Sequence, residues 1–79
     1  MIKIQIYGKG CPKCNDLAHK AEEALRQTGK EGKVEHVADI GEITRKGIML
    51  TPALVIGDEV VSEGKVLSVD DIVKAIRDE

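Results

Sequence analysis

The stretch Gly10-Cys11-Pro12-Lys13-Cys14 holds both cysteines of this 79-residue chain, directly after a run with the pattern of a strand. A proline at the first position of a helix costs nothing, because the N–H that it lacks has no partner there and its fixed φ suits the helix. If a helix begins here, Cys11 lies at its mouth, where the helix dipole stabilises a thiolate. Cys14 follows one turn deeper on the same face. The spacing therefore predicts a dithiol capable of thiol–disulfide exchange.

Two other interpretations of the cysteines stay open. Free cysteine is often simply a buried core residue, and two thiolates also make a site for a soft metal ion. His19 lies five residues beyond Cys14. On a helix this spacing places it off the dithiol face, so a Cys-Cys-His metal site is poorly supported.

Composition predicts a small domain with an aliphatic core. Hydrophobic residues make up 42% of the chain, but there is one Tyr and no Phe or Trp. The net charge is −2, with acidic and basic residues interspersed, which gives no basic patch for nucleic acid and no polybasic membrane anchor. No stretch approaches the ~20 apolar residues of a membrane span, and the N-terminus lacks the pattern of a signal peptide. We expect one domain, residues 1–79, in the cytoplasm, where a lone CxxC is more often catalytic or metal-binding than structural.

Apolar periodicity predicts the element order β-α-β-α-β-β-α. The strands are expected at 2–7, 34–38, 53–56 and 59–63, after a polar loop at 30–33, and the helices at 12–27, 40–46 and from 69 onward. Asp39 and Ser68 are the expected caps of the second and third helices. The uninterrupted apolar run at 53–56 is typical of a central strand covered on both faces.

The CPxC at 11–14, the Thr51-Pro52 pair before a buried strand, the hairpin and the closing helix together resemble the thioredoxin superfamily. Within it, the chain is most similar to the small glutaredoxin-like branch of redox-active disulfide proteins, in which GxGCxxC and TPALVI-like runs recur. The resemblance covers nearly the whole chain. It implies an α/β thioredoxin-like fold, a four-stranded mixed sheet in the order 2-1-3-4 flanked by three helices. The first and last helices would cover one face, and the middle helix the other.

The resemblance also implies roles for particular residues. Cys11 is expected to be the nucleophile and Cys14 the resolving thiol, so the redox-active disulfide is itself the reactive group and no metal or organic cofactor is expected. Pro52 would be a cis-proline beside the dithiol, and the backbone of Thr51 would receive an extended substrate segment by strand addition. Substrate contacts are also expected at the two residues between the cysteines, Pro12 and Lys13.

These features predict a monomeric thiol–disulfide oxidoreductase whose partners are protein disulfide substrates and a reductase. The electron donor stays open between a thioredoxin reductase, a ferredoxin-linked reductase and glutathione. The main alternative is a copper(I) chaperone using the same CxxC, but small ferredoxin-like chaperones need the order β-α-β-β-α-β and end on a strand. A redox-regulated binding module without turnover is a third alternative.

The sequence departs from the thioredoxin pattern at position 5. Gln5 stands where thioredoxins carry a buried Asp that handles the proton of the resolving thiol. Because Gln cannot act as a general base, Cys14 would need water or another group to lose its proton. Asp70 and Asp71 resemble the helix start with which glutaredoxins hold glutathione, although their position also suits the helix dipole.

Other residues near the dithiol have expected roles. Gly8 and Gly10 are expected to let the chain turn sharply from the strand into the cysteines. Lys9 and Lys13 flank the dithiol, where they either favour a thiolate or are solvated surface. The apolar residues 48–50 either form a docking face around the site or fill the core.

Overall fold

The computed structural model describes residues 2–10 and 12–78, so the predicted nucleophile Cys11 lies outside the described residues. The elements follow one another as β1 (Ile2–Tyr7), α1 (Pro12–Thr28), β2 (Gly32–Val37), α2 (Ile40–Arg45), β3 (Ala53–Ile56), β4 (Glu59–Glu63) and α3 (Val69–Arg77). This is the predicted order β-α-β-α-β-β-α. Because a helix separates β2 from β3 and the last element is a helix, the fold is not that of a ferredoxin-like metal chaperone.

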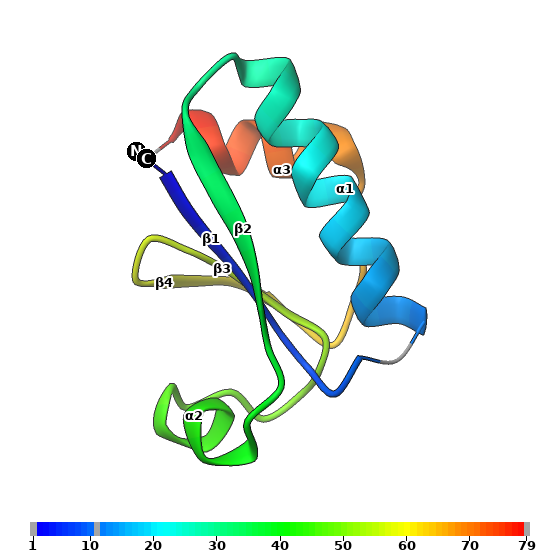
Figure 1. Ribbon diagram of the computed structural model, residues 1–79, viewed down its shortest axis with the longest axis vertical. Coiled ribbons are helices and arrows are strands. Elements are labelled where there is room, and N and C mark those ends of the chain that lie inside the picture. Colours follow the sequence, from blue (N-terminus) through cyan, green and yellow to red (C-terminus); the bar gives the residue numbers. More distant parts are fainter. Residues whose placement is uncertain (1, 11, 79) are drawn as a thin grey trace.

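The four strands form one mixed sheet in the order β2-β1-β3-β4. β1 pairs with β2 in parallel, while β3 runs antiparallel to both β1 and β4. Helices α1 and α3 lie together on one side of the sheet, and α2 lies on the other (Figure 1). The thioredoxin-like topology that the resemblance implied is therefore confirmed.

The face of the sheet under α1 and α3, called here the α1/α3 face, carries the larger apolar cluster. Ile4 and Ile6 of β1 project to this face and are fully buried. Alternate residues of a strand point to opposite sides, so they share it with every second residue of β3. The buried cluster contains Ile4, Ile6, Cys14, Leu17, Ala21, Ala24, Leu54, Ile56, Ile72, Val73 and Ile76.

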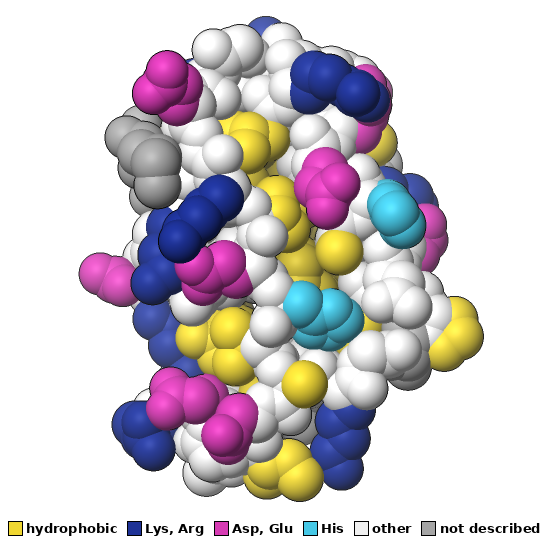
Figure 2. Space-filling model, viewed as in Figure 1, with side chains coloured by type: hydrophobic (Ala, Val, Ile, Leu, Met, Phe, Trp, Pro, Cys, Tyr) yellow, Lys and Arg dark blue, Asp and Glu magenta, His cyan; other side chains and the backbone are white. Residues whose placement is uncertain are grey.

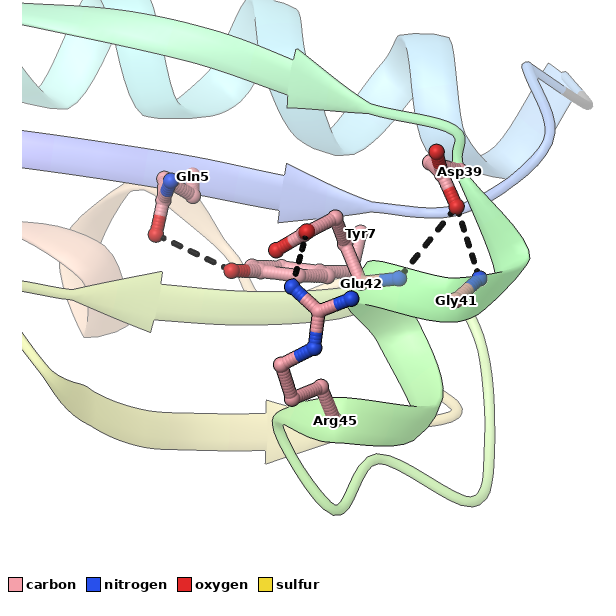
Figure 3. Close-up of polar contacts among 6 residues, drawn as sticks. All are labelled: Gln5, Tyr7, Asp39, Gly41, Glu42 and Arg45. Carbon is pink, nitrogen blue, oxygen red and sulfur yellow. Dashed lines mark hydrogen bonds and ion pairs between the residues drawn. The ribbon is translucent and has the colours of Figure 1, made fainter.

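The opposite side, called here the α2 face, carries a smaller cluster. Its buried members are Tyr7, Ile43, Ile48, Ala53 and Val55. All four residues of β3 are buried, as expected for a central strand covered on both faces. The Asp39 side chain caps α2 by accepting hydrogen bonds from the backbone N–H groups of Gly41, at 2.7 Å, and Glu42, at 3.3 Å (Figure 3).

Strand β2 begins earlier than the sequence predicted. The expected polar loop at 30–33 is wrong for its last two residues, because Gly32 and Lys33 pair with Ile2 and Lys3 in the parallel ladder. Backbone pairing does not require apolar side chains, so a polar start hides the beginning of a strand. A Cβ at Gly32 would stand 2.4 Å from the carbonyl oxygen of Ile2, so the close approach of the two backbones needs a glycine.

Figure 2 shows acidic and basic side chains interspersed over one face of the molecule, with apolar side chains between them. This mixture agrees with the net charge of −2. Among the described residues, 2–10 and 12–78, no helix is long and apolar enough to span a bilayer.

Candidate functional site

The first turn of α1 places the predicted resolving thiol inside the protein. Pro12 is the first residue of the helix, as the sequence predicted, and both Pro12 and Lys13 are exposed. Cys14 has no solvent exposure and belongs to the cluster on the α1/α3 face. The first turn of this helix contains no acidic residue, and the positive end of the helix dipole lies there beside Lys13.

Gly8 lies directly against the sulfur of Cys14. A Cβ built on Gly8 would stand 3.5 Å from the Cys14 Cβ, which is an ordinary contact, but only 2.3 Å from the Cys14 Sγ. Real atoms do not tolerate the shorter of these two distances. The backbone N–H of Gly8 donates a 2.9 Å hydrogen bond to the carbonyl oxygen of Val37, which fixes the position of the glycine at the end of β1. Position 8 must therefore lack a side chain if the thiol is to occupy this place.

Gly8 and Gly10 serve different purposes, although the sequence suggested one turn-forming role for both. Gly10 has a φ of +82° and open space around its Cα, so it is needed for its backbone conformation. Gly8 is not among the residues with positive φ, and its role is to leave room for Cys14. The prediction for Gly10 is confirmed, whereas for Gly8 the structure gives a steric reason that the sequence did not show.

The Thr51-Pro52 pair lies beside Gly8 and Cys14. The peptide bond between Thr51 and Pro52 is cis, in agreement with the resemblance. Pro52 is fully buried and Thr51 is exposed. The Thr51 Cβ lies 3.7 Å from the position that a Cβ on Gly8 would take. The structure thus brings Cys14 and the Thr51-Pro52 pair together around Gly8, while the substrate-binding roles of Thr51, Pro52, Pro12 and Lys13 stay predictions.

The apolar segment 48–50 is divided between core and surface. Ile48 is 6% exposed and packs in the cluster on the α2 face, whereas Met49 is 89% exposed and Leu50 62%. Glu63 holds the exposed part, because its Oε1 accepts hydrogen bonds from the backbone N–H of Met49, at 2.8 Å, and of Leu50, at 3.4 Å. The sequence analysis missed Glu63, since no local pattern links a strand-end carboxylate to a loop more than ten residues earlier.

Gln5 does not lie beside Cys14. It alternates with Ile4 and Ile6 along β1, and its Oε1 accepts a 3.2 Å hydrogen bond from the hydroxyl of Tyr7 (Figure 3). Tyr7 packs in the cluster on the α2 face. The side chain of residue 5 therefore does not lie next to Cys14, the predicted resolving thiol, although thioredoxins carry their buried Asp at the corresponding position.

Burial raises the pKa of Tyr7 above its ordinary value, and the nearby carboxylates of Glu42, Asp58 and Glu35 raise it further. Glu35 in turn has a lowered pKa, mainly because Lys33 donates a hydrogen bond to its carboxylate. The Lys33 Nζ lies 2.8 Å from the Glu35 Oε1. Tyr7, with its raised pKa, thus lies near three carboxylates on the side of the sheet opposite Cys14.

The other candidates lie at the surface. Lys9, His19 and His36 are exposed, and Asp70 and Asp71 lie exposed in the first turn of α3. Within residues 2–10 and 12–78, no group of three or more His, Cys, Asp or Glu side chains is arranged to bind a metal ion. A shallow hollow of about 580 Å³ lies between the end of α1 and the start of β2, and neither Cys14 nor Thr51 lines it. The residues that line it are Glu22, Leu25, Arg26, Lys30, Glu31, Gly32, Lys33 and Val34.

The sequence profile of the thioredoxin domain family matches residues 2–77. The chain belongs to this family. Two curated proteins named thioredoxin, from Methanocaldococcus jannaschii and Methanothermobacter thermautotrophicus, are each 34% identical to it. The first similarity spans 77 residues, which is 98% of this chain and 88% of the relative, and the second spans 76 residues, which is 96% and 99%.

A solved structure of thioredoxin-2, described as a component of malaria parasite protein secretion machinery, shares the fold. Its TM-score is 0.75 at 12% identity, and the similarity covers all of this chain and 84% of that one. Family membership and the named relatives make this thioredoxin domain a thioredoxin-like oxidoreductase in general terms. The narrower placement in a glutaredoxin-like branch stays a prediction.

Proposed function

We propose that this protein reduces disulfide bonds in other proteins, with Cys11 as the nucleophile and Cys14 as the resolving thiol. The observation that supports the proposal most strongly is the meeting of Cys14, Gly8 and the Thr51-Pro52 pair at the start of α1. In a chain with two cysteines, Cys11 is the residue that completes the CxxC in the sequence. Family membership supports the same reaction class.

The reaction is a pair of sulfur displacements. The Cys11 thiolate attacks one sulfur of the target disulfide, which forms a mixed disulfide and releases the other target sulfur as a thiolate. The Cys14 thiolate then attacks the Cys11 sulfur and releases the second target thiol. Two electrons pass to the target, and the protein is left with a Cys11–Cys14 disulfide. A reductase or a small thiol must return it to the dithiol, and no metal or organic cofactor takes part.

The order of these steps suits a buried Cys14 with exposed residues around it. Cys14 is fully buried, so it meets a substrate only after the substrate is attached to the protein. Thr51, Pro12 and Lys13 are exposed and are available for the target segment, with Thr51 offering its backbone to an extended chain. We propose that the protein works as a monomer in a reducing compartment such as the cytoplasm.

Cysteine variants test the proposal directly. We expect the wild type to accelerate the reduction of insulin by dithiothreitol, and the variant Cys11→Ser to lose this activity completely. Cys14→Ser should accumulate a mixed disulfide between Cys11 and the target, because the resolving thiol is absent. Mass spectrometry under non-reducing conditions detects this mixed disulfide. The same method measures the reduction potential of the cysteine pair in a redox titration, because the chain has no Trp whose fluorescence could be followed. A wild type that gives no acceleration, and a Cys14→Ser variant that traps no target, would overturn the proposal.

A further inference from the structure

The segment 49–52 is held in place by the end of β4. Glu63 is the last residue of that strand and pairs with Ala53, the residue after Pro52. Its Oε1 accepts hydrogen bonds from the backbone N–H groups of both Met49, at 2.8 Å, and Leu50, at 3.4 Å. A carboxylate that accepts from backbone N–H groups makes a charge-assisted hydrogen bond, which is stronger than a neutral one.

The core anchors only the two ends of this stretch of chain. Ile48 before it and Pro52 at its end are buried, but the side chains of Met49 and Leu50 are 89% and 62% exposed. Thr51 is exposed as well. Exposed side chains bury little apolar surface, so they contribute little to fixing the backbone that carries them. The two hydrogen bonds to Glu63 therefore fix the backbone of Met49 and Leu50, which side-chain packing does not fix.

Gly64 brings the same strand end close to the segment. Its backbone N–H donates a 2.9 Å hydrogen bond to the carbonyl oxygen of Pro52. It has a φ of +74°, and a Cβ at this position would stand 3.1 Å from the Cβ of Leu50. Because the glycine lets the chain turn at this point, the Glu63 carboxylate remains next to the N–H groups that it accepts from.

We infer that Glu63 is a positioning residue for disulfide exchange. Its carboxylate orders residues 49–51 before a substrate arrives, so that the Thr51 backbone already stands beside Cys14 in the geometry that an extended target segment needs. Ordering a loop at the moment of binding costs free energy, and a loop that is already ordered avoids this cost. The inference rests on the proposed function, because it assigns Glu63 to the presentation of the substrate.

Three variants test this role. Glu63→Ala removes the acceptor, Glu63→Gln keeps an acceptor oxygen without the charge, and Glu59→Ala changes the exposed glutamate at the other end of β4 as a matched control. For a protein disulfide substrate we expect Glu63→Ala to raise KM about tenfold with kcat within about twofold of the wild type. Glu63→Gln should recover most of the loss, and Glu59→Ala should behave as the wild type does.

Hydrogen exchange supplies a readout that is independent of turnover. In Glu63→Ala the amide hydrogens of Met49 and Leu50 should exchange at least about tenfold faster, because their acceptor is gone. Alkylation of the thiols by iodoacetamide should be unchanged in all three variants, since a small reagent does not use the segment. An active wild type with an unchanged KM in Glu63→Ala would overturn this inference alone, whereas an inactive wild type would overturn the proposed function.

Discussion

The two faces of the sheet give the same strand two different environments. On the α1/α3 face, Ile4 and Ile6 of β1 are packed with Cys14 in a closed, aliphatic cluster. On the α2 face, Tyr7 of the same strand is buried, but its hydroxyl hydrogen-bonds to Gln5 and three carboxylates act on its pKa. Among the described residues, Cys14 thus packs with aliphatic side chains, while the carboxylates that act on Tyr7 lie on the other side of the sheet.

This difference shows which residues can influence the thiol. A side chain of β1 reaches Cys14 only if it projects to the α1/α3 face. Gly8, just after the end of the strand, lies against Cys14 and leaves room for its sulfur because it has no side chain. Gln5 and Tyr7, although close to the cysteines in sequence, are separated from Cys14 by the backbone of β1. We therefore expect the face of the sheet that a side chain occupies to decide whether it affects the chemistry of Cys14.

The largest expected effect comes from opening a cavity on the α1/α3 face. Leu17 is fully buried there, so Leu17→Ala should lower the free energy of unfolding by about 3 to 4 kcal/mol. That is a large part of the roughly 4 to 12 kcal/mol expected for a chain of this length. Ile43→Ala on the α2 face should cost only about 2 kcal/mol, because Ile43 is 9% exposed and packs in a smaller cluster. Urea unfolding followed by circular dichroism measures both, and equal losses would contradict the difference between the faces.

The next largest effect is expected at Gly8. In Gly8→Ala the new methyl group would overlap the sulfur of Cys14, so the thiol must rotate or the end of β1 must move. We expect kcat/KM for protein disulfides to fall about tenfold, with the mixed disulfide of Cys11 accumulating because its displacement by Cys14 is slowed. Quenched-flow kinetics with mass analysis follows this species.

Gly41→Ala on α2 is the matched control for that change. A Cβ at Gly41 would meet only the Oδ1 of Asp39, at 3.1 Å, on the side of the sheet away from the thiol. Turnover in this variant should stay within about twofold of the wild type. If Gly8→Ala resolved its mixed disulfide as fast as Gly41→Ala does, the close contact between Gly8 and Cys14 would have no catalytic importance.

Most of the architecture could be predicted from the sequence because it depends on local, repeating patterns. Each of these patterns involves only a few neighbouring residues. The structure contains the alternating strand β1, the apolar strand β3 and the helix caps at Asp39 and Ser68. The start of β2 was missed because its pairing with β1 uses backbone groups, which leave no mark on the pattern of polar side chains. Cys11 lies outside the described residues.

The details of the site were harder to predict, because they depend on contacts between distant parts of the chain. A glycine is needed either for its φ or for its small size, and only the structure distinguishes Gly10 from Gly8 in this respect. Glu63 acts on backbone N–H groups 13 and 14 residues earlier in the chain, so no spacing rule reveals it. The segment 48–50 had to be seen in place to separate buried Ile48 from exposed Met49 and Leu50.

A smaller effect is expected from the buried phenol on the α2 face. Since the pKa of Tyr7 is raised in the folded protein, the unfolded chain releases this proton first as the pH rises. The contribution of Tyr7 to stability is therefore complete below its ordinary pKa of about 10 and is lost as the pH rises through the folded-state value. The free energy of unfolding of the wild type should fall more steeply above pH ~10 than that of Tyr7→Phe. Urea unfolding of both proteins between pH 8 and 11 isolates this group, since all other residues are shared, and parallel curves would contradict the prediction.

The smallest effect on catalysis is expected at Gln5. If residue 5 reached Cys14, the proposed resolving thiol, Gln5→Asp would supply a general base and change the pH profile of turnover. The side chain instead accepts a hydrogen bond from the Tyr7 hydroxyl, on the side of β1 away from Ile4, Ile6 and Cys14. We therefore expect the pH profile to move by less than about 0.3 units, since a carboxylate there is separated from the thiol by the sheet.

Stability, in contrast, should respond to the same substitution. Aspartate is too short to keep the 3.2 Å hydrogen bond from the Tyr7 hydroxyl, and it brings a second negative charge near Glu35. A loss of about 1 kcal/mol is expected, most of it shared by the control Gln5→Asn, which shortens the side chain without adding a charge. Turnover as a function of pH and urea unfolding, measured on both variants, separate the two effects. A pH profile that shifted in Gln5→Asp but not in Gln5→Asn would show that position 5 acts on Cys14 through the sheet, and the division between the two faces would not hold for the chemistry.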